Sequence, residues 1–216
     1  MVTQIEQILV EAWKKFCNYY DTKAPQYRQN WRPKLTEEPA KKLSWICWNE
    51  NDLIFHTGRF FYDILKQNKG KEFSNIEIHL EKNISPPNFN MYPFAMYQFA
   101  DRLEKLKTRL KKWPKVDIIV AFEDSNASFL LCAEVKCFHC AQRGGPIPVI
   151  NADIEKLKVI RDLGIAKSVV FILFDDYYWC NDVATFAEIQ QKLEEIKQEG
   201  GIIVLFHTSK AKLENY

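Results

Sequence analysis

Residues 116–136 read VDIIVAF-EDSNAS-FLLCAEVK, two runs of apolar, β-branched or aromatic residues on either side of a polar turn. This pattern predicts a β-hairpin. Side chains alternate across a strand, so each run has two faces. We expect one face to be core, formed by Val116, Ile118, Val120, Phe122, Phe129, Leu131, Ala133 and Val135. The other face collects Asp117, Ile119, Ala121, Leu130, Cys132, Glu134 and Lys136.

The hairpin register places two acids side by side. If the chain turns about Ser125 and Asn126, Asp117 lies opposite Glu134, with Lys136 two positions further along the same face. Directly opposed residues have Cβ atoms about 5 Å apart. Two acids in an apolar sheet are costly unless a cation compensates them. A hard divalent metal would do so and would also recruit phosphate oxygens, whereas a salt-bridged cluster on a solvated face is the alternative.

Asp117, followed on the next strand by Glu134-Val135-Lys136, resembles the signature of the PD-(D/E)xK nucleases, which have the restriction-endonuclease-like fold. The proline that precedes the aspartate in this family is Val116 here. The resemblance covers roughly residues 49–206. It implies an α/β fold with an αβββαβ core, in which a mixed central sheet is flanked by helices. An N-terminal helix and an inserted basic helix would be additions to that core.

The resemblance also implies a function and a site. The chain would be a divalent-metal-dependent nuclease, with a DNA endonuclease favoured over an enzyme acting on RNA. Asp117, Glu134 and the Val135 carbonyl would bind Mg²⁺ or Mn²⁺, and Glu50 would complete the metal shell. Lys136 would hold the attacking water or the developing negative charge. For Glu50, a helix-dipole acid facing water is the alternative.

Two other functions remain open. One is a nuclease-fold subunit that binds nucleic acid without catalysis. The other is an α/β enzyme acting on a small molecule, although the sequence has neither a glycine-rich phosphate loop nor a nucleophile elbow.

Composition sets limits on these readings. The 216 residues suit a single nuclease-like domain, with an N-terminal helix and loop over 1–43 and a core over 44–208. The net charge is only +2, so any nucleic-acid surface must be a local patch. No apolar run long enough for a membrane span and no signal peptide is found, which predicts a cytoplasmic protein with no membrane partner. A homodimer stays open.

The cysteines carry a separate prediction. Six are scattered along the chain, and without a secretory signal they read as reduced thiols. Cys137 and Cys140 lie beside the predicted site, but a structural zinc site needs four ligands and no second cysteine pair is present. We therefore expect both to be free thiols.

Hydrophobic periodicity predicts the N-terminal elements. We expect a helix over 3–20 and a loop over 21–42, in which Pro25, Pro33 and Pro39 act as helix breakers. Aromatic and basic residues alternate in that loop at 27–34, a pattern that suits nucleic acid. Asn49 is the expected N-cap of a second helix, which ends at Gly70 and in which Gly58 allows close approach to a sheet. A strand follows over 76–80.

The remaining elements are expected in α/β order. A basic helix spans 94–112 and could line a nucleic-acid cleft. After the hairpin come a loop over 143–146, a helix over 153–163, a strand over 168–174, a helix over 183–198 and a strand over 202–206. Lys156 and Lys158, on the first of these helices, could face a phosphate backbone.

Overall fold

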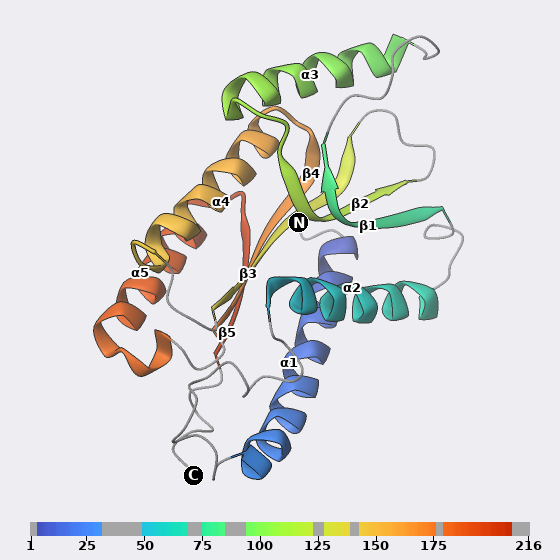
Figure 1. The fold of residues 1–216 in the computed structure, drawn as a ribbon. Helices are drawn as coiled ribbons and strands as arrows, with labels where there is room; N and C mark the ends of the chain where they lie inside the picture. The colour runs from blue at the N-terminus through green and yellow to red at the C-terminus, as the bar shows by residue number, and fades with distance from the viewer. Residues whose placement is uncertain are drawn as a thin grey trace.

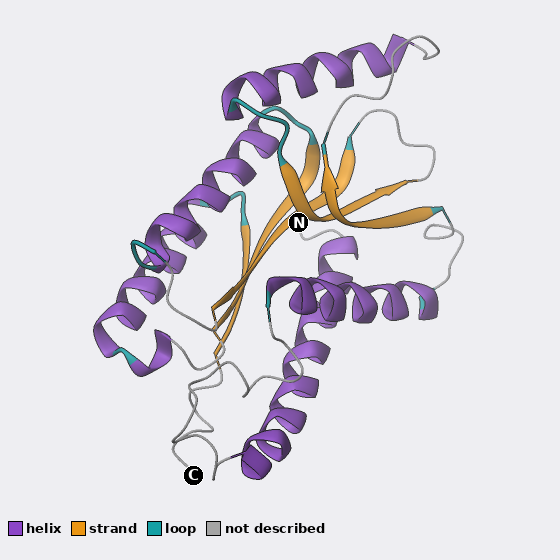
Figure 2. Cartoon of the chain, in the orientation of Figure 1, coloured by secondary structure: helices purple, strands orange, loops and turns teal. Residues whose placement is uncertain are grey.

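The structure is a computed structural model that describes residues 4–31, 49–68, 75–84, 94–122, 128–138, 143–175 and 179–208. These residues form a mixed α/β fold with five α-helices around a five-stranded open sheet (Figures 1 and 2). The elements are α1 (Gln4–Trp31), α2 (Glu50–Gln67), β1 (Ile76–Asn83), α3 (Phe94–Leu110), β2 (Lys115–Phe122), β3 (Phe129–Phe138), α4 (Pro146–Asp162), β4 (Ala166–Asp175), η4 (Trp179–Asn181), α5 (Val183–Glu199) and β5 (Ile203–Thr208).

The strands lie in sequence order across the sheet. β1, β2 and β3 are antiparallel neighbours, whereas β3, β4 and β5 run parallel to one another. In the predicted hairpin, Ile118 pairs with Ala133 and Val120 with Leu131. This is the predicted register, which places Asp117 and Glu134 at adjacent positions of neighbouring strands.

Both faces of the sheet are buried. Helices α1 and α2 cover one face, where Phe16 and Phe61 pack with Ile118 of β2. Helices α3, α4 and α5 supply apolar residues to the other face, where Leu157 packs in one cluster with Ile119. The prediction of a single core face was therefore incomplete, because a sheet between two helical layers excludes water from both sides.

Three of the residues assigned to that core face behave differently. Val116 and Phe129 join the opposite cluster, and Phe122 is 39% exposed. All three lie in the first two residues or at the last residue of a strand. Neighbouring elements, more than strict alternation, decide which way a side chain turns at such positions.

Helix α1 is longer than predicted. It continues to Trp31, so the prediction of a loop from residue 21 was wrong for residues 21–31. Pro25 lacks an amide hydrogen and therefore loses one helical hydrogen bond, but the backbone on either side stays helical. Tyr27–Trp31 thus belong to a helix, and the rest of the predicted aromatic-basic loop lies outside the described residues.

Helix α4 begins seven residues before the predicted start at Asp153. Pro146 opens it, directly after Gly145, which has a φ of 87°. Proline is favourable at the first helical position because its φ is already helical and its missing N–H would be unpaired there. The predicted loop over 143–146 is correspondingly reduced to residues 143–145.

The remaining elements agree with prediction to within a few residues. Gly58 lies against β1, where an added Cβ would sit 3.1 Å from Leu80 Cδ2, as expected of a close approach. Gly70, the turn at 123–127 and Cys140 lie outside the described residues. Among the helices that the structure describes, none has the length and apolar character needed to cross a membrane.

Candidate active site

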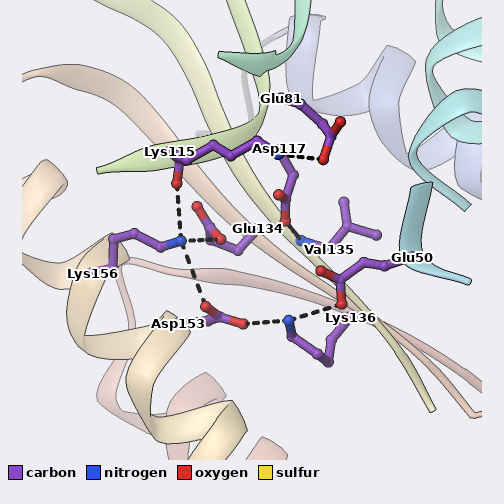
Figure 3. A network of polar contacts seen from close by, with 9 residues as sticks. All are labelled: Glu50, Glu81, Lys115, Asp117, Glu134, Val135, Lys136, Asp153 and Lys156. Carbon is purple, nitrogen blue, oxygen red and sulfur yellow. Dashed lines mark hydrogen bonds and ion pairs between the residues drawn. The ribbon is translucent and has the colours of Figure 1, made fainter. Parts of the chain in front are cut away.

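The four side chains predicted from sequence lie together where the start of β2 runs beside β3 (Figure 3). Asp117 comes from β2, Glu134 and Lys136 come from β3, and Glu50 is the first residue of α2. Lys136 Nζ lies 2.8 Å from Glu50 Oε2. The amide of Val135 donates to Asp117 Oδ2 at 2.7 Å, which ties the start of β2 to β3 beside Glu134.

The start of α2 positions Glu50. Asn49 is the N-cap, as predicted, and its side chain accepts a hydrogen bond from the Asp52 amide at 3.1 Å. This cap stabilises the first turn of the helix, and Glu50 in that turn pairs with Lys136. The alternative of an acid that faces only water does not describe this residue.

Helix α4 adds Asp153, which the sequence analysis did not name as a site residue, and Lys156, which it named only as a phosphate contact. Lys156 pairs with Glu134 and also lies 3.6 Å from Asp153 Oδ1. Asp153 Oδ2 lies 3.3 Å from Lys136 Nζ, so this acid connects the two lysines. The sequence did hold one signal: Asp153 falls three residues after Ile150 and four before Leu157, on the buried stripe of the helix.

The cluster carries more acid than base. Glu50, Asp117, Glu134 and Asp153 surround Lys136 and Lys156, so with every group ionised the acids outnumber the lysines. Asp117 is 9% exposed and Glu134 only 2%. A site of this kind attracts a further cation.

Burial governs how the acids of the two strands titrate. It raises the pKa of Glu134 well above its ordinary value, and the neighbouring Asp117 charge adds to the effect. Burial also raises the pKa of Asp117, although the Val135 amide partly opposes it by stabilising the carboxylate.

Lys136 titrates in the opposite environment. Burial by itself would lower its pKa, but the charges of Asp153 and Glu50 outweigh this, so the pKa is raised above the ordinary lysine value. Lys136 is therefore a cation throughout the neutral range.

The donor set fits a hard divalent ion. Glu134 Oε1 is buried and has no hydrogen-bond partner among the residues that the structure describes. Carboxylate oxygens are the ligands that Mg²⁺ and Mn²⁺ prefer. In the described part of the chain, no three His, Cys, Asp or Glu side chains already form a metal-binding group. Lys136 and Lys156 contact the carboxylates instead.

Basic residues of α3 and of the turn that follows it divide into two groups. Arg102 donates to the Gly164 carbonyl at 2.6 Å, Lys105 pairs with Asp101, and Lys107 lies over the Trp113 ring. Of these three, only Arg102 ties the helix to a distant segment, whereas Lys105 and Lys107 contact residues within or just after the helix. The second group consists of exposed residues with no ion-pair partner in the described segments: Arg109, Lys111 and Lys112.

The structure describes four of the six cysteines, and the prediction that Cys137 and Cys140 bind no metal stays a prediction. Cys17, Cys132, Cys137 and Cys180 are buried, and none of them is in a disulfide. Burial raises the pKa of Cys17 and of Cys132. A thiol of this kind is a poor nucleophile.

Comparison with known proteins gives no family. No protein-family model, no curated protein and no solved structure significantly matches the chain. A function for it is therefore argued from the site and the arrangement of the elements.

Proposed function

We propose that the protein is a divalent-metal-dependent nuclease with a restriction-endonuclease-like core that cleaves phosphodiester bonds in DNA. One observation carries the proposal: Asp117 and Glu134 are buried on paired strands, and Lys136 and Glu50 reach the same place. The order α2, β1, β2, β3, α4, β4 supports it, since it follows the αβββαβ order once α1 and α3 are set aside.

The acids bind the divalent ion in this proposal. Asp117 and Glu134 would hold Mg²⁺ or Mn²⁺, with Glu50 and the Val135 carbonyl as further oxygen ligands. When bound, the ion supplies Lewis-acid polarisation of the scissile phosphate. The bond from the Val135 amide keeps one oxygen of Asp117 fixed, which leaves the other oxygen to bind the ion.

Lys136 acts as a cation in this scheme. Because its pKa is raised, it stays protonated at neutral pH and does not serve as a general base. It donates hydrogen bonds to the attacking water or to the phosphate oxygen on which negative charge develops. Its contacts with Glu50 and Asp153, at 2.8 and 3.3 Å, hold the side chain in the site.

A second function is favoured by one specific observation. Lys136 and Lys156 already pair with Glu50, Asp153 and Glu134. Three of the four acids therefore have a lysine partner without any metal. A subunit that binds nucleic acid without cleaving it could retain the cluster for structural reasons alone.

The deciding experiment measures nicking of a supercoiled plasmid by the purified protein with Mn²⁺ or Mg²⁺. Wild type should nick, and Asp117→Asn, Glu134→Gln and Lys136→Met should each lose on the order of 10²-fold or more in rate. Glu81→Gln is the matched control, because Glu81 lies beside the site and pairs with Lys115 at 2.6 Å. It should cleave like wild type.

Two results would reject the proposal. If all three site variants cleave like wild type, the site is wrongly assigned. If wild type binds DNA tightly and never cleaves with either metal, the binding-subunit function is correct.

A further inference from the structure

We infer that Lys156 is a built-in counter-ion of Glu134 in the metal-free protein, and that it must leave this shared ligand before the divalent ion can bind. This rests on the proposed function, and it describes how the same site is regulated.

The contacts of Lys156 carry the inference. Its ammonium group contacts three oxygens: one of the Glu134 carboxylate, the Lys115 carbonyl at 3.1 Å and Asp153 Oδ1 at 3.6 Å. Of these groups, Glu134 is also a proposed ligand of the divalent ion, because carboxylate oxygens are ligands that a hard metal ion prefers. The side chain of Lys115 itself pairs elsewhere, with Glu81, so only its carbonyl faces this position.

Glu134 explains why a cation has to be present. A carboxylate that is 2% exposed is costly without a partner of opposite charge. Lys156 neutralises it through Oε2, but Oε1 remains without a hydrogen-bond partner in the described part of the chain. One ammonium group thus satisfies half of the carboxylate, and a divalent ion could engage both oxygens.

The two cations therefore compete for one acid. The apparent affinity of the protein for the metal ion is therefore weaker than the affinity of a site from which Lys156 has already left. The difference is the free energy needed to detach Lys156 from Glu134. A chain in which residue 156 cannot form the pair should bind the ion more tightly. An ordinary supporting residue would have the opposite effect, since its loss would disorder the site and weaken binding.

The test is the dissociation constant for Mn²⁺, measured from the electron paramagnetic resonance signal of free Mn²⁺ with no nucleic acid present. A pH of about 8 keeps proton competition for the carboxylates low. Lys156→Met should bind Mn²⁺ on the order of 10-fold more tightly than wild type, a change of about 1.4 kcal/mol. Lys156→Arg keeps the positive charge and should stay near wild type.

Lys158→Met is the matched control. Lys158 lies on the same helix and pairs with Glu199 at 2.8 Å, so its substitution removes the same charge without touching Glu134. It should leave Mn²⁺ affinity unchanged, which separates the loss of a specific competitor from a general change in charge.

Thermal melting provides a second readout. In EDTA, Lys156→Met should melt below wild type, because Glu134 is left buried without its partner. Added Mn²⁺ should raise its melting temperature by more than it raises that of wild type. Lys156→Gln, which keeps a polar side chain, is the substitute if the methionine variant fails to fold.

The outcomes separate this inference from the proposed function. If wild type binds Mn²⁺ and Lys156→Met binds equally or more weakly, the counter-ion role is wrong and the nuclease proposal stands. If neither protein binds Mn²⁺, both fail. Binding by Lys156→Met alone would mean that Lys156 blocks the site outright, which supports the inference in its strongest form.

Discussion

The amide of Val135 donates a 2.7 Å hydrogen bond to Oδ2 of Asp117. The regular pairing of β2 with β3 ends at Ile118 and Ala133, and this bond links the two strands through a side chain just beyond that point. It places the Asp117 carboxylate beside Glu134, which directly follows Ala133 on β3.

This bond leads to a prediction about Asp117→Asn. Asparagine keeps an oxygen that can accept the Val135 amide, but it removes a buried charge whose pKa is raised by burial. The metal-free variant should therefore be as stable as wild type or more so. Mn²⁺ raises the stability of a protein only by binding the folded state, so the variant should lose that effect. Thermal melts with EDTA and with Mn²⁺ check this, and an undiminished Mn²⁺ shift would contradict it.

A second prediction concerns the pH dependence of stability in EDTA. Because burial raises the pKa of Glu134 well above 4.5, the folded state holds a proton that the unfolded state has already released. Stability should consequently fall as the pH rises from the ordinary glutamate pKa through the raised value. Asp117 contributes in the same direction.

Glu134→Gln should flatten this dependence, since glutamine does not titrate. Chemical denaturation at several pH values gives the required slopes, and Glu81→Gln serves as a control with an acid that is better exposed. Equal slopes for wild type and Glu134→Gln would show that Glu134 titrates normally.

A third prediction tests the role of α1 in the core. Phe16 is fully buried, and its ring centroid lies 5.5 Å from that of Phe174 on β4. Phe16→Ala should lower the free energy of unfolding by about 3–5 kcal/mol. Lys15→Ala, next to it in sequence and in an exposed pair with Glu11, should change it by less than about 0.5 kcal/mol. A small effect of Phe16→Ala would mean that α1 is only loosely attached.

A fourth prediction concerns binding to DNA. If Arg109, Lys111 and Lys112 contact phosphates, the logarithm of the affinity should fall with the logarithm of salt concentration by roughly 0.9 per contact. Replacing all three with alanine should weaken binding and flatten that slope. Lys105→Ala is the control, because Lys105 is already paired with Asp101 at 2.6 Å. Fluorescence anisotropy in a salt series measures both quantities, and an unchanged slope would remove these residues from the interface.

Local rules were sufficient for several features of the fold and site. Alternation of side chains and a short polar turn specify a hairpin register, and the observed pairing of Ile118 with Ala133 agrees with it. The cap at Asn49 likewise depends on residues that are neighbours in sequence. For these features the sequence by itself determined the outcome, because the interactions that decide them join residues that are close together in the chain.

Only the tertiary structure decided the rest of the site. Asp153 and Lys156 reach Lys136 and Glu134 because α4 packs across β3, and sequence spacing within α4 contains no information about that packing. The direction of Glu50 was undecided for the same reason, since its partner is 86 positions away along the chain. Pairings between distant segments depend on how whole elements pack. The balance of acids and lysines in this site therefore follows only from the tertiary structure.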